Sequence, residues 1–99
     1  MAALNQNVNL TIRYDMPAEK WELLQVVYES MPGWLGDDKD GCPVWRPTGP
    51  GNGEISASVE PSGLLLYFDV SEDAWKVWMT EFCEKASKAL GPPVVDADA

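Results

Sequence analysis

The sequence predicts an α+β fold: a three- to five-stranded, mostly antiparallel sheet with two amphipathic helices packed on one face. Segments in which apolar and polar residues alternate indicate half-buried strands. Two longer segments carry apolar residues at helical spacing, and turn-forming residues separate the segments. The expected order is β-α-(β)-β-β-α-(β), with the short strands in brackets. A chain of 99 residues suffices for one hydrophobic core, so residues 1–99 are expected to form a single domain.

The first expected strand covers residues 8–14 and leads into the first helix. Its alternation places four residues on the buried side: Val8, Leu10, Ile12 and Tyr14. Asp15 is expected to cap the helix, with Pro17 in the first turn, and Pro32-Gly33 ends it after Met31. The apolar arc of this helix comprises Trp21, Leu24, Val27, Tyr28 and Met31.

Residues 32–53 are rich in glycine and proline. This composition predicts a long irregular loop with at most one short strand, around residues 44–46. Long loops in compact domains are commonly functional or mobile. The segment is therefore the first place to look for a site.

Two further strands, over residues 54–60 and 63–70, are expected to form a hairpin. The turn residues between them favour a register that sets Glu60 opposite Leu64. The apolar pattern instead favours Val59 opposite Leu64, which keeps the apolar side chains of both strands on one face. We expect the second register, because burying several side chains at about 1.5 kcal/mol or more each outweighs a turn preference.

The second helix is expected to begin after a Ser71 cap and to end at Gly91. Its apolar stripe is the clearest periodic signal in the chain: Trp75, Trp78, Met79, Phe82, Ala86, Ala89 and Leu90. Val94 and Val95 are expected to add a short edge strand. Residues 96–99 are expected to form a short, frayed acidic tail.

Composition excludes several functions. Sixteen acidic against seven basic residues give a net charge of −9, which argues against nucleic-acid or membrane binding through a basic patch. The chain has no histidine, and so lacks the commonest general base and zinc ligand. The acidic run 37–40 before Gly41 fails the EF-hand pattern, because Pro47 stands where the bidentate Glu belongs. We therefore expect no enzyme activity, catalytic residue, cofactor or metal.

The compartment predicted from the sequence is the cytoplasm. The N-terminal residues have neither the basic nor the apolar region of a secretory signal, and no apolar run approaches the length of a membrane span. Cys42 and Cys83 are too far apart for a CxxC motif and are expected to be free thiols.

Two groups of residues are candidate sites. The first is a partner-binding surface in the long loop, where aromatic and arginine side chains accompany acids: Trp34, Asp37, Asp38, Asp40, Trp45 and Arg46. The alternative for its two tryptophans is that they cap the core. The second group would share the sheet face opposite the helices and could line a shallow cleft: Glu54, Ser56, Ser58, Tyr67 and Asp69.

Small size, acidity and the lack of histidine favour a non-catalytic protein-binding domain with a basic protein partner. An inhibitor or immunity protein that neutralises a bacterial toxin is the most concrete form of this hypothesis, and the overall composition is similar to that of such immunity proteins. The alternatives are a small ligand-binding or carboxylate-based enzyme domain that uses the open sheet face, and a structural or assembly subunit. The sequence is also compatible with a homodimer.

Overall fold

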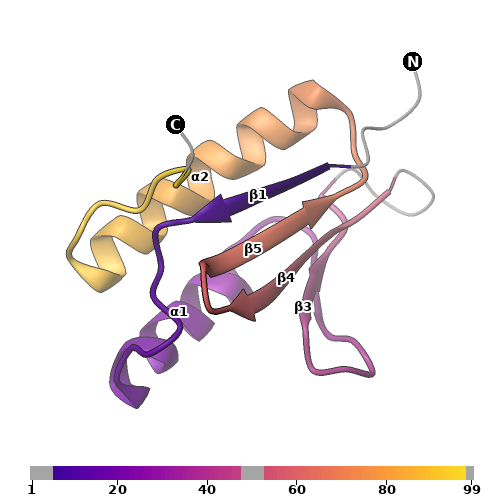
Figure 1. The fold of residues 1–99 in the computed structure, drawn as a ribbon. Coiled ribbons are helices and arrows are strands. Elements are labelled where there is room, and N and C mark those ends of the chain that lie inside the picture. Colours follow the sequence, from indigo (N-terminus) through magenta and orange to yellow (C-terminus); the bar gives the residue numbers. More distant parts are fainter. Residues whose placement is uncertain (1–5, 48–52, 98–99) are drawn as a thin grey trace.

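A computed structural model describes residues 6–47 and 53–97, which form an antiparallel sheet of five strands and two helices (Figure 1). The strand order across the sheet is β1-β5-β4-β3-β2. This confirms the predicted α+β class. The elements in chain order are β1 Gln6–Leu10, α1 Ala18–Ser30, β2 Trp34–Asp37, β3 Pro43–Trp45, β4 Ile55–Glu60, β5 Gly63–Phe68 and α2 Glu72–Leu90.

The central hairpin, β4–β5, has the register that the apolar pattern predicts. Val59 lies opposite Leu64, and Glu60 lies opposite Gly63. This register directs five buried side chains to one face of the sheet: Ile55, Ala57, Leu64, Leu66 and Phe68. Val59, at the turn end of the hairpin, is the exception and is 50% exposed.

Both helices cover this apolar face, so the domain has two layers (Figure 1). From α2 the buried side chains are Trp75, Trp78, Phe82, Ala86 and Leu90, and from α1 they are Leu24, Val27 and Tyr28. Trp45 of β3 is fully buried between the layers, with its ring centroid 4.9 Å from that of Trp78 and 5.5 Å from that of Tyr28. A connected group of aromatic rings therefore joins the sheet to both helices.

The one short strand expected within residues 32–53, around residues 44–46, is present as β3. The rest of the predicted irregular loop is wrong for residues 34–37, which form β2 and pair with β3 to make the β2–β3 hairpin. Its connection closes because Gly41 adopts a φ of 80°, a conformation that glycine reaches without strain. The Asp38 N–H donates to the Cys42 carbonyl at 2.9 Å and the Gly41 N–H donates to the Asp38 carbonyl at 3.0 Å. The remainder of the predicted loop includes residues 48–52, which lie outside the described residues.

The connection from β1 to α1 also differs from its prediction. The strand ends at Leu10 and, although Ile12 remains buried, Tyr14 is 56% exposed. Asp15 does not cap α1: its carboxylate accepts two hydrogen bonds from Arg13, at 2.8 and 3.0 Å, and the N-cap position falls on Pro17. By contrast, the predicted cap of α2 is confirmed, since the Ser71 hydroxyl accepts a hydrogen bond from the Ala74 N–H at 3.2 Å.

The C-terminal segment pairs with the outer side of β1. The Thr11 N–H donates to the Val95 carbonyl at 3.0 Å, and the Ala97 N–H donates to the Asn9 carbonyl at 2.7 Å. The predicted edge strand at Val94 and Val95 is thus an isolated bridge centred on Asp96. Residues 96 and 97 are not a frayed tail, because these backbone bonds hold them, while residues 98 and 99 lie outside the described part of the chain.

Candidate functional site on the open sheet face

Strand alternation separates a helix-covered face from an open face of the sheet. In β4 and β5, Ser56 lies opposite Tyr67 and Ser58 lies opposite Leu65, all on the side away from the helices. At the end of the β4–β5 hairpin that lies away from its turn, the Asp69 N–H donates to the Glu54 carbonyl at 3.0 Å, which sets these two acids side by side. We call this surface the open face and define it by Val44, Arg46, Glu54, Ser56, Ser58, Glu60, Leu65, Tyr67 and Asp69.

The whole second predicted group is therefore brought together. Glu54, Ser56, Ser58, Tyr67 and Asp69 all belong to the open face, because the β4–β5 register matches the expected one.

Tyr67 lies in the middle of a row that crosses four strands. Its neighbours in this row are Asn7 on β1 and Ser56 on β4, and Val44 on β3 follows Ser56. Because the flanking side chains are small or short, the tyrosine ring stands above them, and 45% of the residue is exposed. The open face thus presents an accessible aromatic ring whose neighbours across the strands are neutral.

Arg46 belongs to the open face as well. Its Nε donates to a carboxylate oxygen of Glu54 at 3.3 Å, and both side chains are about half exposed, at 46% and 45%. The sequence assigned Arg46 to the first group, with the tryptophans. In the structure it pairs with an acid of the second group, since the β3–β4 pairing sets the end of β3 beside the start of β4.

The first predicted group does not form one surface. Trp45 is fully buried, and its indole N–H donates to the Tyr28 carbonyl at 2.8 Å, so this residue is not available to a partner. Trp34 is half-buried, with its ring 5.6 Å from that of Trp45 and stacked 6.5 Å from that of Tyr28. The pairing of Trp34 with Trp45 directs both rings toward the helices. Trp34 and Trp45 therefore pack into and against the core, as in the alternative prediction for these two residues.

The acids of the first group remain exposed at the tip of the β2–β3 hairpin. One carboxylate oxygen of Asp38 accepts hydrogen bonds from the backbone N–H groups of Asp40, at 2.8 Å, and Cys42, at 3.1 Å. Asp38 therefore shapes the turn that presents Asp40. Asp37 lies close enough to Tyr28 of α1 to affect its ionisation. Burial, and after it the negative charge of Asp37, raises the pKa of Tyr28 above its ordinary value.

Glu60 lies on the open face near the tip of the β2–β3 hairpin, and it was not among the residues predicted for either site. It lies two residues after Ser58 on the same strand face, and the Ser58 hydroxyl donates to its carboxylate. Burial, followed by the charges of nearby acids that include Asp38, Asp40 and Glu60, raises the pKa of the Cys42 thiol. The period-two spacing of Ser56, Ser58 and Glu60 is the signal that could have identified Glu60.

The described residues also constrain other kinds of site. Within residues 6–47 and 53–97, no group of three or more acidic or cysteine side chains is arranged to hold a metal ion. Cys42 and Cys83 are free thiols, and burial raises the pKa of Cys83 as well. In the same part of the chain, neither helix has the length and apolarity needed to cross a bilayer.

Comparisons with known proteins identify no relative. No family model matches the chain, and neither the curated proteins nor the solved structures give a match.

Proposed function

We propose that this protein is a non-catalytic binding domain that engages a basic protein through its open face, with Tyr67 as the central contact. The observation that carries the proposal is the exposed Tyr67 ring, 45% accessible on a sheet face with acidic side chains at both ends. Tyrosine is enriched among interface residues that dominate binding energy. An aromatic centre with a charged rim is the usual anatomy of a protein interface.

The acids favour a basic partner. Asp38, Asp40 and Glu60 lie toward one end of the open face, while Glu54 and Asp69 lie at the other. In a chain of net charge −9, these carboxylates would accelerate association with a cationic surface and disfavour acidic competitors. Arg46 partly neutralises Glu54. The end of the open face near Asp38, Asp40 and Glu60 is therefore the more acidic of the two.

The specific form that we propose is a cytoplasmic inhibitor or immunity protein of a bacterial toxin system. A nuclease toxin has a cationic active site, and carboxylates presented on a rigid hairpin can occupy the positions of substrate phosphates. The Asp38 hydrogen bonds hold the tip in one conformation, which reduces the entropy lost on binding.

Co-purification with a matched pair of tyrosine variants tests the proposal. The tagged chain is co-expressed with the product of the neighbouring gene and, separately, incubated with lysate of its source. Tyr67→Ala removes the central ring of the open face, whereas Tyr14→Ala removes a 56% exposed ring outside it. We expect a salt-sensitive complex with a basic protein whose Kd rises about tenfold or more for Tyr67→Ala and is unchanged for Tyr14→Ala.

Two further variants examine the charge. Asp40→Asn and Glu60→Gln each remove one carboxylate from the more acidic end of the open face. We expect each variant to associate more slowly with the partner and to show a weaker dependence of the association rate on salt. A partner that binds wild type and Tyr67→Ala equally well would contradict the proposal. A homodimer that captures no other protein would instead support an assembly subunit.

A further inference from the structure

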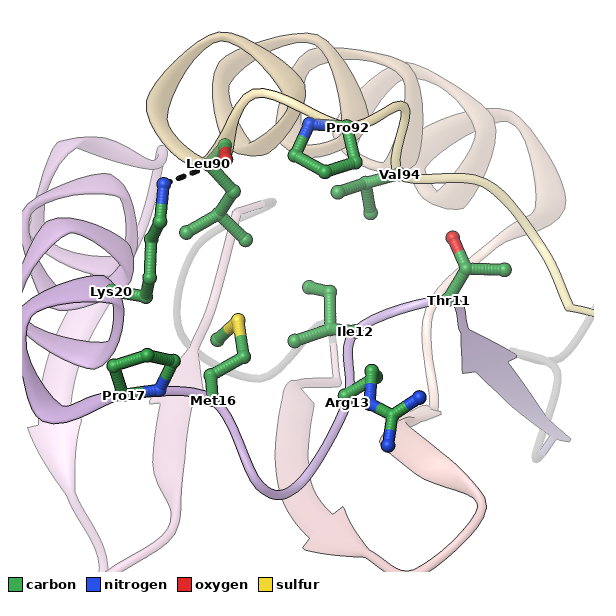
Figure 2. A pocket seen from close by; sticks show the side chains of 9 residues that line it. All are labelled: Thr11, Ile12, Arg13, Met16, Pro17, Lys20, Leu90, Pro92 and Val94. Carbon is green, nitrogen blue, oxygen red and sulfur yellow. Dashed lines mark hydrogen bonds between the residues drawn. The ribbon is translucent and has the colours of Figure 1, made fainter.

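A pocket lies away from the open face, bordered by the β1–α1 connection, the start of α1 and the end of α2 (Figure 2). It is a pocket of about 260 Å³. Ile12, Leu90 and Val94 form its floor and are 2%, 5% and 3% exposed. Pro17 and Pro92 are exposed at its rim, so the pocket opens to solvent above an apolar floor.

The volume limits the ligand. An apolar cavity of about 150 Å³ is enough to bind benzene. A pocket of about 260 Å³ can therefore take a substituted ring or a chain of about eight carbons, and it falls just below the usual range for pockets that hold drug-sized ligands, which begins near 300 Å³. The pocket suits the apolar body of a small molecule.

The charged side chains that line the pocket are Arg13 and Lys20, both cationic in a strongly acidic protein. Arg13 is already paired with Asp15 at 2.8 Å. The Lys20 ammonium is half-buried and donates one hydrogen bond, at 3.0 Å, to the Leu90 carbonyl at the end of α2. An ammonium has three donors, so Lys20 can also bind an anion at the rim.

We propose that this pocket binds a small organic acid, with its aliphatic or aromatic body over Ile12, Leu90 and Val94 and its carboxylate on Lys20. The charge complementarity at the rim selects the anionic form of such a ligand over a neutral one. This site shares no residue with the open face and does not depend on the proposed partner.

Titration of the full chain with octanoate and octanol tests the pocket without any mutation. The two probes have the same chain length and differ in the charge of the head group. We expect both to shift the backbone amide NMR signals of Ile12, Lys20 and Leu90, and octanoate to bind about fivefold or more tightly than octanol. An absence of shifts at these residues at probe concentrations above about 1 mM would overturn the proposal.

A pair of lysine variants then assigns the anion contact. Lys20→Met keeps the aliphatic stem and removes the charge, while Lys39→Met removes the same charge at the tip of the β2–β3 hairpin. We expect octanoate and octanol to bind Lys20→Met with similar affinity, and Lys39→Met to keep the wild-type preference. Circular dichroism of each variant shows that the fold is retained, and an unchanged preference in folded Lys20→Met would refute the role of Lys20.

Discussion

Tyr28 is the side chain whose acid–base chemistry the fold alters most clearly. It is 5% exposed, and its ring stacks against those of Trp34 and Phe82. Burial disfavours the phenolate and raises the pKa, and the negative charge of Asp37 acts in the same direction. The folded state therefore holds Tyr28 as the neutral phenol at pH values at which an exposed tyrosine ionises.

Alkaline unfolding should report this shift. Below the ordinary tyrosine pKa of about 10 both states are protonated and the full stability is present. Above it only the unfolded state loses the proton, so the free energy of unfolding falls by up to about 1.4 kcal/mol per pH unit. We expect Tyr28→Phe to remove this part of the pH dependence, as measured by urea unfolding between about pH 9 and pH 12. Equal pH slopes for the two proteins would show that Tyr28 ionises freely in the folded state.

Trp45 shows what a single residue in the sequence leaves undecided. It follows an acidic, glycine- and proline-rich segment, a context equally consistent with an exposed anchor and with a core residue. The structure buries it, and the Tyr28 carbonyl accepts its indole N–H. That carbonyl belongs to α1, 17 residues earlier in the chain, and such a long-range contact has no local signature.

At the level of elements, the length of a strand decided whether it could be predicted. β4 and β5 have six residues each, and their alternation specified both the strands and their register. β2 has four residues, too few for a period of two to appear, and it contains Gly36. β3 has three residues and was expected only as an isolated short strand, without its pairing partners. The grouping of Arg46 with Glu54 depends on the β3–β4 pairing and was therefore inaccessible from sequence.

The two hairpin glycines should respond differently to substitution. A Cβ on Gly63, where φ is 134°, would lie 2.4 Å from the Leu10 carbonyl oxygen of the neighbouring strand. A Cβ on Gly41, where φ is 80°, would meet nothing within 4 Å. We expect Gly41→Ala to cost about 1–2 kcal/mol from backbone strain alone. Gly63→Ala should cost about 3 kcal/mol or more, because β1 must also move.

Denaturant unfolding of both glycine variants measures this difference. The matched substitution Gly41→Asn provides a control, since asparagine tolerates the left-handed conformation better than alanine, and it should be the mildest of the three. Equal losses for Gly63→Ala and Gly41→Ala would mean that β1 does not approach the hairpin as the structure shows.

For the whole molecule, the net charge of −9 is more a cost to stability than a source of it. The ion pairs of the described residues are solvent-exposed, with side-chain accessibilities from 36% to 80%. Such pairs contribute about 0–1 kcal/mol each. Salt should therefore relieve long-range repulsion among sixteen acids while it weakens few favourable contacts.

We expect the melting temperature to rise by several degrees between about 0.02 and about 0.5 M sodium chloride at neutral pH, since about 1 kcal/mol shifts a domain of this size by about 4–8 °C. Thermal melts followed by far-UV circular dichroism measure the change. A melting temperature that falls with salt would indicate that the surface ion pairs outweigh the repulsion.

The aromatic core also gives the molecule an internal optical probe. Trp34, Trp45, Trp78 and Trp75 form a chain of ring contacts, with successive centroids 5.6, 4.9 and 6.0 Å apart. Rings fixed in such an asymmetric environment give a near-UV circular dichroism band that disappears when tertiary packing is lost. The residues that define the open face, and those drawn in Figure 2, include no tryptophan. A variant at either site that fails to bind yet keeps this band has lost a contact and not its fold.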